Sequence, residues 1–418
     1  MSSSLPTEVA TLISRMRQLL PPLLSTQRAS WEQGVAAQAL LECHQLFTRS
    51  DLSSSASPFD LFQYTYAFAH DTLVRQAEDG RIGTRLNGDG TSDAGAADPA
   101  CIGESIYYVL QQSRSGREVP AADELEEGVD KMLEYVMEKC SRAPVNDSNE
   151  DIGSNWLLSH RIDTVQIWSD TVYMLPPFLV SASLYLLSLE HVHTQYQSRR
   201  LLTMGLQQVM LAAKVLQAET GEWSHIYDLS TSQFKRKAFW GVGNGWVCGG
   251  ILRILRPIAY EARDPLSPLV VLIRSDQELI GQMLQCHDIL MDTITACLRH
   301  MRTDYLFHDI LDDPVSFVET NLSQELAYAL YRVLDFHLNE TPLPGVAFPR
   351  LSQETLEEWE KTAEHLRDAA IAKTDSMGFV RDVCGSPSFD KLGTAAEGQA
   401  WGILMEVARA EYLLHKPR

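Results

Sequence analysis

Apolar residues recur at three- and four-residue spacing along most of this 418-residue chain, and this spacing constrains the fold more than any other feature. It is the period of an α-helix with one buried face, whereas the alternation typical of β-strands is nearly absent. We place the predicted helices at 7–20, 30–47, 59–78, 99–113, 121–140, 170–189, 195–217, 244–262, 275–302, 320–338, 352–373 and 395–414. Twelve helices of similar length predict six helical hairpins. We therefore expect an all-α fold, an (α/α)6 barrel with an inner ring of helices inside an outer ring.

The connections between these helices differ in length and composition. Long loops rich in Gly, Asp, Ser and Trp are expected at 79–98, 141–169, 218–243 and 303–319. If these loops gather at one end of the ring, they build a pocket there. The segment 51–58 is expected to be a plain loop, and no linker divides the chain. We therefore expect one domain over residues 1–418.

The charge of the chain excludes some classes of partner. The formal net charge is −20 and the pI is about 5.0, so nucleic acid and anionic membranes should repel the protein. The N-terminal residues lack the pattern of a signal peptide, and no apolar run is long enough to span a bilayer. The seven cysteines are scattered and form no C-x-x-C pair, so we expect reduced, mostly buried thiols in a cytoplasmic protein.

The segment 219–247 contains an unusual concentration of large aromatic residues. It contains Trp223, His225, Trp240 and Trp246, together with glycines that allow close backbone approach to a ligand. The flat face of tryptophan suits stacking on a sugar ring. The glycine pattern is Gly-x-Gly-x-Gly without a preceding strand, so it is not a dinucleotide fingerprint. The segment therefore favours a carbohydrate-active enzyme.

Asp170 lies beside Trp168 at the start of an apolar helical segment. Aspartate at this position commonly caps a helix. A carboxyl held against aromatic and apolar surface also has a raised pKa and can donate a proton near neutral pH. Capping and catalysis are both open for Asp170 from the sequence alone.

Asp98 ends a glycine-rich run and precedes Pro99, which suits the first turn of a helix. We expect Asp98 to be the N-cap of that helix. A functional role is compatible with capping, because a second carboxylate near Asp170 would help to keep one of the two protonated.

Three further groups are candidates for contacts in the same site. His225 is predicted in a loop between tryptophans, and His160 and Arg161 are predicted in the loop before Asp170. The basic run 235–237 is either a solvated loop or a local positive charge facing an anionic ligand.

Several motifs together resemble the unsaturated glucuronyl and rhamnogalacturonyl hydrolases, glycoside hydrolase families 88 and 105, and are most similar to fungal members of the rhamnogalacturonyl group. The resemblance is carried by Trp31-Glu32-Gln33-Gly34, the helix start at Asp98, the segment 166–174, Trp223-Ser224-His225, the segment 239–246, His308-Asp309, the segment 319–323 and the segment 393–400. Their order and spacing cover most of the chain. The resemblance implies an (α/α)6 barrel that needs neither metal nor cofactor.

The resemblance also implies a reaction and its residues. These enzymes hydrate the C4=C5 double bond that polysaccharide lyases leave on a terminal uronic acid. The catalytic aspartate of the family corresponds to Asp170, and its second pocket aspartate to Asp98. His225 matches a pocket histidine, while Trp240 and Trp246 match the aromatic segment that lines the site. The expected partner is an oligosaccharide with an unsaturated uronic acid, most simply galacturonyl-rhamnose from pectin.

One position departs from the family pattern. Bacterial relatives commonly have a ligand-binding arginine where this chain has Val242. The basic run 235–237 or Arg161 could replace it, or the sugar could differ. Three alternative functions stay open: an unsaturated glucuronyl hydrolase, a catalytically weakened carbohydrate-binding homologue, and a glycosidase with two carboxylates.

Overall fold

The computed structural model describes residues 6–49, 59–84, 94–145, 156–189, 192–274, 276–338 and 348–417. The segment 51–58 and residues 87–93 of the glycine-rich run lie outside the described residues.

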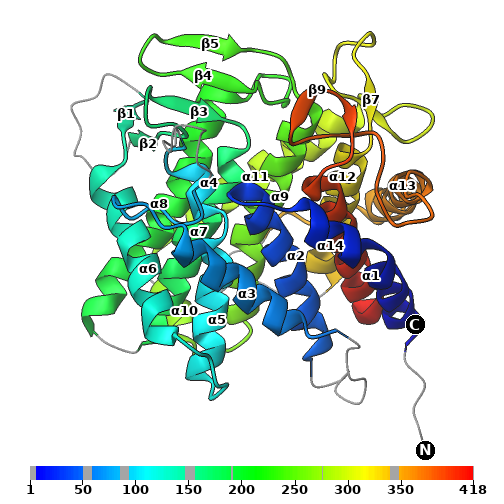
Figure 1. Cartoon of the computed structure of the whole chain (residues 1–418). Helices are drawn as coiled ribbons and strands as arrows, with labels where there is room; N and C mark the ends of the chain where they lie inside the picture. Colours follow the sequence, from blue (N-terminus) through cyan, green and yellow to red (C-terminus); the bar gives the residue numbers. More distant parts are fainter. Residues whose placement is uncertain are drawn as a thin grey trace, which may run out of the picture.

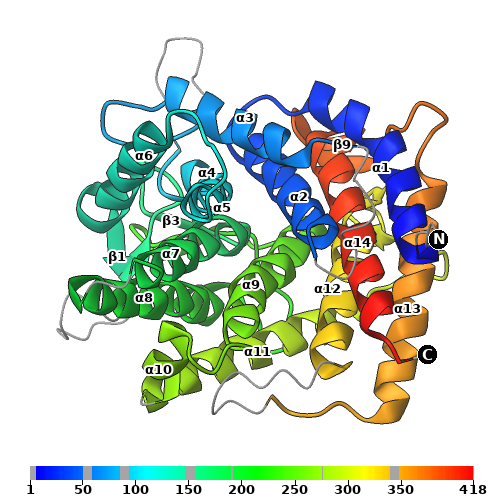
Figure 2. The same cartoon turned by 90° about the horizontal axis from the view of Figure 1, so that it is seen from below.

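Six helices form a closed inner ring. They are α2 (Trp31–Phe47), α5 (Gly103–Arg114), α7 (Thr171–Leu187), α9 (Gly241–Glu261), α12 (Asn321–Leu338) and α14 (Ala396–His415). Each packs against the next in this order, and α14 packs against α2, which closes the ring seen in Figure 2.

The partners of these helices form an outer ring around them (Figure 2). They are α1 (Thr7–Thr26), α3 (Leu61–Val74), α6 (Ala122–Glu134), α8 (Val192–Leu216), α11 (Gln277–Leu298) and α13 (Gln353–Ala372). The helix α6 continues into a π-helical turn, η1 (Tyr135–Lys139), and two short helices, α4 (Ala97–Ala100) and α10 (Pro268–Arg274), lie in connections. All twelve predicted helices are present, so the predicted (α/α)6 barrel is confirmed.

The two rings differ in how their sequences meet the core. The inner helix α7 is buried on nearly every face, because neighbours surround it on all sides. The outer helix α13 buries a single stripe, Trp359, Ala363, Leu366 and Ala370, at the three- and four-residue spacing of one helix face.

The long loops form short antiparallel strands. The pairs are β1 (Arg142–Pro144) with β2 (Trp156–Leu158), β3 (Gln166–Trp168) with β4 (Ile226–Asp228), β4 with β5 (Gln233–Arg236), β6 (Phe307–His308) with β7 (Val318–Glu319), and β8 (Val383–Gly385) with β9 (Ser388–Gly393). Figure 1 shows these strands together at the top of the barrel, where the inner helices begin. The predicted gathering of the loops at one end is confirmed. The strands themselves were not predicted, because they are too short for an alternating pattern to stand out.

The cysteines agree with the sequence prediction of burial, since all of them are buried and free. Among the described helices, none is long and apolar enough to cross a membrane. The single-domain boundary and the cytoplasmic location stay predictions.

Candidate active site

Backbone pairing between two loops brings Asp98 into the candidate site. The amide of Gly95 donates to the carbonyl of His160 at 2.7 Å, and that of Ala96 donates to Ser159 at 3.0 Å. A Cβ at position 95 would lie 2.6 Å from the carbonyl oxygen of Ser159, so this approach requires glycine. The pairing sets α4, which carries Asp98, against His160.

Asp98 and His160 form a buried ion pair. Nε2 of His160 lies 3.2 Å from Oδ1 of Asp98, and Nδ1 lies 2.9 Å from Oγ1 of Thr171. Burial opposes the charged imidazole, but the Asp98 charge and hydrogen bond outweigh it and raise the pKa of His160. The ring stacks on Trp168 with centroids 4.3 Å apart, which also favours the imidazolium form.

The expectation that Asp98 caps a helix is wrong. The helix α4 begins at Ala97, its N-cap residue is Ala96, and Asp98 lies inside the first turn. The pairing of residues 95 and 96 with the neighbouring loop sets the earlier start. The carboxylate of Asp98 is therefore directed to His160 instead of to a cap.

Asp170 occupies the N-cap position of α7, but its carboxyl does not cap the helix in the described structure. Its φ of −68° and ψ of −17° are already helical, whereas a capping side chain needs an extended backbone. The first turn is closed instead by its carbonyl, which accepts from the amide of Tyr173 at 3.0 Å. The carboxyl of Asp170 is therefore available for chemistry.

The surroundings of Asp170 favour its protonated form. Burial raises the pKa of Asp170 to about 6, and the Asp98 charge adds to this, while the His160 and Arg236 charges oppose it. Such a carboxyl can hold a proton near neutral pH and deliver it to a substrate.

His225 faces Asp170 from the neighbouring loop. The amide of Ser169 donates to the carbonyl of His225 at 2.9 Å, and the imidazole packs on Trp240 with centroids 4.5 Å apart. Nε2 of His225 lies 3.9 Å from Oδ1 of Asp170, and neither atom has a hydrogen-bond partner among the described residues. A substrate hydroxyl or water contacting both atoms would complete their hydrogen bonding.

The protonation of His225 follows from its neighbours. Burial and the charge of Arg236 lower the pKa of His225 well below its usual value, so the imidazole is neutral. Nδ1 lies 3.1 Å from Nη1 of Arg236, which can only donate. Nδ1 is therefore the acceptor, and the ring proton is on Nε2, on the side of Asp170.

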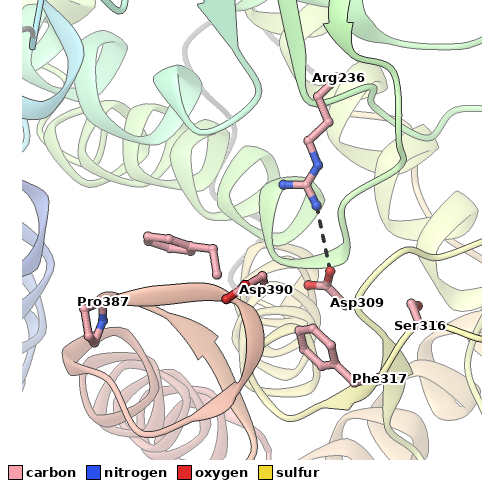
Figure 3. Close-up of a pocket in the computed structure, with 7 residues that line it drawn as sticks. Arg236, Asp309, Ser316, Phe317, Pro387 and Asp390 are labelled. Carbon is pink, nitrogen blue, oxygen red and sulfur yellow. Dashed lines mark ion pairs between the residues drawn. The ribbon is translucent and has the colours of Figure 1, made fainter.

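A pocket of about 510 Å³ opens beside this group (Figure 3). It is lined by Arg236, Asp309, Ser316, Phe317, Pro387, Phe389 and Asp390. Its volume lies within the range of about 300–1,000 Å³ found for small-molecule sites. Arg236 and Asp309 face each other across it, with Nη2 and Oδ2 3.8 Å apart.

Two predicted tryptophans lie next to residues that line the pocket. Nε1 of Trp240 donates to Oδ1 of Asp309 at 3.0 Å, and its ring lies 6.2 Å from Phe389. Trp31 lies 6.5 Å from Phe389 on another side, and its Nε1 donates to Glu397 at 2.8 Å. Phe389 of the hairpin β8–β9 thus lies close to the first residue of α2 and to the N-cap residue of α9.

The comparison with known families decides the class of the protein. A sequence profile described as Glycosyl Hydrolase Family 88 matches residues 12–342, which is most of the chain. The chain belongs to glycoside hydrolase family 88. It is therefore a glycoside hydrolase, as its motifs predicted.

Solved structures of related enzymes share the fold of this family-88 protein at low sequence identity. A possible member of family 105 from Klebsiella pneumoniae is 15% identical, with a TM-score of 0.66 over 98% of this chain and 94% of that one. A family 105 enzyme from C. acetobutylicum is 14% identical, with a TM-score of 0.60 over 98% and 100%. The unsaturated glucuronyl hydrolase of Bacillus sp. GL1 is 13% identical, with a TM-score of 0.53 over 93% and 87%. Among curated protein sequences no relative is found.

Two predicted sugar contacts of the family-88 protein lie in its core instead of beside the pocket. Trp223 is fully buried, and its Nε1 donates to Thr293 at 3.0 Å. Trp246 packs between Tyr173 and Trp401, with centroids 4.5 and 5.5 Å away. The structure does not bring these two tryptophans to the group around Asp170.

The glycines of the 239–246 segment have a packing role. A Cβ at Gly243 would collide with the hydroxyl of Ser169, and one at Gly245 would collide with the carboxyl of Glu325. They allow α9 to approach its neighbours, whereas the sequence suggested that they bring backbone close to a ligand.

The side chains of the basic run 235–237 point in different directions. Lys235 and Arg236 belong to β5, and Lys237 follows it. Lys235 is exposed and pairs with Asp228 at 3.4 Å, and exposed Lys237 lies over Phe234. Arg236 points the other way, into the site. Arg161 forms an ion pair with Asp163 at 2.8 Å.

Sequence reasoning did not select the residues of β8–β9 or assign a role to Asp309. The motif His308-Asp309 pointed to the region of Asp309, and the segment 393–400 pointed to the region next to β9. Neither motif contains Phe389 or Asp390. In the parts of the chain that the structure describes, no group of His, Cys, Asp and Glu side chains could hold a metal ion.

Proposed function

We propose that this glycoside hydrolase hydrates the C4=C5 double bond of a terminal Δ4,5-unsaturated galacturonyl residue and so releases the adjacent rhamnose from rhamnogalacturonan fragments of pectin. The observation that carries the proposal is Asp170, a buried carboxyl whose pKa is raised to about 6 and whose side chain is not used as a cap. An acid that can hold and then release one proton is what hydration of a double bond requires.

The proposed reaction uses one carboxyl twice. Protonated Asp170 donates its proton to C4, and a water adds to C5. The carboxylate of Asp170 takes the proton that this water loses, which restores the acid. The product is a hemiketal at C5, and its ring opens and releases the neighbouring sugar.

The neighbours of Asp170 support both halves of this cycle. His225 directs its Nε2 toward the carboxyl and could hold the water or a sugar hydroxyl there. His160 and Asp98 provide a fixed pair of charges whose effects on Asp170 oppose each other. Trp168 and Trp240 pack against His160 and His225, so two aromatic rings lie next to the group around Asp170, as is typical of sugar-binding sites.

The pocket supports a neutral, partly apolar second sugar. Phe317, Phe389 and Pro387 provide apolar contact that suits the methyl group of a 6-deoxy sugar such as rhamnose. Asp309 and Asp390 can accept hydrogen bonds from hydroxyl groups. Arg236 is the one cation in the pocket lining.

The relatives support the reaction class more broadly than the substrate. The Bacillus enzyme is named as an unsaturated glucuronyl hydrolase responsible for the degradation of glycosaminoglycan. Unsaturation at C4 and C5 removes the difference between galacturonate and glucuronate, so the second sugar is what separates the two activities. Hydrolysis of unsaturated glucuronyl units is therefore the alternative.

The test follows the ultraviolet absorbance of the conjugated double bond. Galacturonyl-rhamnose and glucuronyl disaccharides, each unsaturated, are incubated with the protein in D2O, and the products are analysed by NMR. We expect absorbance to fall fastest for galacturonyl-rhamnose, with one deuterium incorporated at C4. Faster loss from a glucuronyl disaccharide would establish the alternative.

The same assay separates the remaining functions. Release of the second sugar with the absorbance retained would indicate ordinary glycosidic cleavage by two carboxylates. Binding of the disaccharides without any loss of absorbance would indicate a carbohydrate-binding homologue.

A further inference from the structure

Arg236 is the only residue of its basic run that turns toward the site. Its guanidinium lies 5.7 Å from the centre of the Trp240 ring, 3.1 Å from Nδ1 of His225 and 3.8 Å from Asp309. It lines the pocket on one side and influences the pKa of Asp170 on the other. Arg236 therefore stands where the pocket meets the catalytic group.

We propose that Arg236 binds the carboxylate of the unsaturated uronic acid and thereby selects anionic sugars for this site. The choice of ligand rests on the proposed function. The carboxylate of such a sugar is attached to C5, next to the C4 atom that Asp170 protonates. The cation that receives it must consequently lie within a few ångströms of Asp170.

The other candidate cations, His160 and Arg161, are already engaged. His160 is charged, but it pairs with Asp98 and donates toward Thr171. Arg161 pairs with Asp163 through both Nε and Nη2. Arg236 differs, because its ion-pair contact with Asp309, at 3.8 Å, exceeds hydrogen-bond length. A substrate carboxylate can replace this contact with a charge-assisted hydrogen bond.

Position 242 cannot perform this role in this chain. Val242 is 1% exposed and packs in the hydrophobic core at the start of α9. The resemblance gives this position an arginine. In this chain, the guanidinium reaches the site from the end of β5 instead of from α9.

Asp309 and His225 orient Arg236 before substrate binds. Asp309 is fixed by Nε1 of Trp240 at 3.0 Å, and His225 accepts from Nη1. A planar guanidinium held in this way offers its remaining N–H groups in a fixed direction, which suits the two oxygens of a carboxylate. The local positive charge also compensates for a chain of net charge −20.

The experiment measures binding in an Asp170→Asn background, so that the substrate is not consumed. Tryptophan fluorescence is titrated with the unsaturated galacturonyl-rhamnose disaccharide and with its methyl ester, which lacks the negative charge. The variants are Arg236→Gln and Arg236→Lys. Lys235→Gln and Lys237→Gln are matched controls, because each removes one positive charge from the same run at an exposed position.

We expect Arg236→Gln to weaken binding of the acid about 10- to 100-fold, as loss of a hydrogen bond to a charged group does. It should weaken binding of the ester far less, so that the variant no longer distinguishes acid from ester. Arg236→Lys should restore part of the preference, and both lysine controls should bind like the parent. A merely structural role would weaken binding of acid and ester equally.

Equal loss for acid and ester, or no loss for either, would overturn the proposal. Turnover is then measured separately with Asp170 present. Carboxylate-dependent binding through Arg236 without loss of absorbance would retain the role of Arg236 and reject the proposed hydration. Turnover of the unsaturated disaccharide that is unaffected by Arg236→Gln would retain the proposed hydration and reject the role of Arg236.

Discussion

Buried carboxyl groups occur in two regions inside the barrel, and their surroundings give them opposite properties. Where the inner helices begin, burial raises the pKa of Asp170 to about 6, of Glu397 to about 7 and of Glu319 to about 8. Several turns further along the helices, Glu42 is buried and Glu411 is largely buried, but nearby arginine charges outweigh burial and lower their pKa values.

The second region is a closed ion-pair network. Glu42 accepts from Arg253 at 2.7 Å and from Arg332 at 2.5 Å, while Arg332 and Arg256 also bind Glu411. These residues join α2, α9, α12 and α14. The comparison shows that burial without a paired arginine raises the pKa of an acid, whereas burial with paired arginines makes it a structural anion. The first region, the loop end of the barrel where the inner helices begin, is therefore suited to proton transfer. The ion-pair network is suited to holding the inner helices together.

The largest expected effect is the loss of activity when Asp170, at the loop end, is replaced. Replacing Asp170 with Asn removes the exchangeable proton and should lower kcat/KM for the unsaturated disaccharide by about 10³-fold. Loss of absorbance measures this directly. Asp264→Asn, at an exposed turn beyond α9, is the matched control and should behave like the wild type. A retained rate in Asp170→Asn would assign the proton donor to another residue.

The next effect is the loss of stability when Glu42, in the ion-pair network, is replaced. Glu42→Gln removes one of the two carboxylate partners of Arg253 and of Arg332, whose others are Glu104 and Glu411, and should destabilise the fold by about 3 kcal/mol, measured by urea unfolding. The folded fraction should keep its kcat. Glu127→Gln removes an exposed pair with Lys131 and should change stability far less. Similar unfolding midpoints for the two variants would contradict a structural role for the network.

An effect of similar size concerns the pH dependence of stability. Asp170 has a higher pKa folded, about 6, than its usual 3.8, so wild-type stability should fall as the pH rises between these values. This loss amounts to about 3 kcal/mol above pH 6. Asp170→Asn should escape it and be more stable than wild type at pH 8. Glu42 and Glu411 of the network have lowered pKa values, so their contribution to the stability of the fold should be lost as the pH falls. Unfolding curves across pH test both signs.

The smallest expected effect is a shift in the pKa of Asp170 when His160 is replaced. The charge of His160 lowers the pKa of Asp170, so His160→Gln should move the alkaline limb of the kcat/KM profile to higher pH. The wild-type limb should begin near pH 6. The rate should also fall, because Asp98 loses its partner. A limb displaced to lower pH would show that His160 acts on Asp170 in another way.

The helices and their ring could be predicted from the sequence, because burial imposes a period over many residues. Details set by contacts between loops could not. The start of α4 depends on the pairing of Gly95 with His160, which is remote in sequence. Lys235 and Arg236 could not be distinguished from the sequence. Because side chains alternate along a strand, β5 turns only Arg236 inward, and β5 is too short to be recognised from its residues.

The tryptophans show the same limit. Trp223 and Trp240 lie in the same aromatic segment 219–247, yet one fills the core and the other contacts Asp309 of the pocket lining. Aromatic content identifies a sugar-binding region, but the packing of α9 against its neighbours decides which rings reach the pocket.

The protonation of Asp170 tests the central claim most directly. The carbonyl stretch of a protonated carboxyl is followed by infrared difference spectroscopy between the wild type and Asp170→Asn across pH. We predict a band assigned to Asp170 that is half lost near pH 6. A band already lost below pH 4 would show an ordinary, ionised aspartate and would contradict its role as the proton donor.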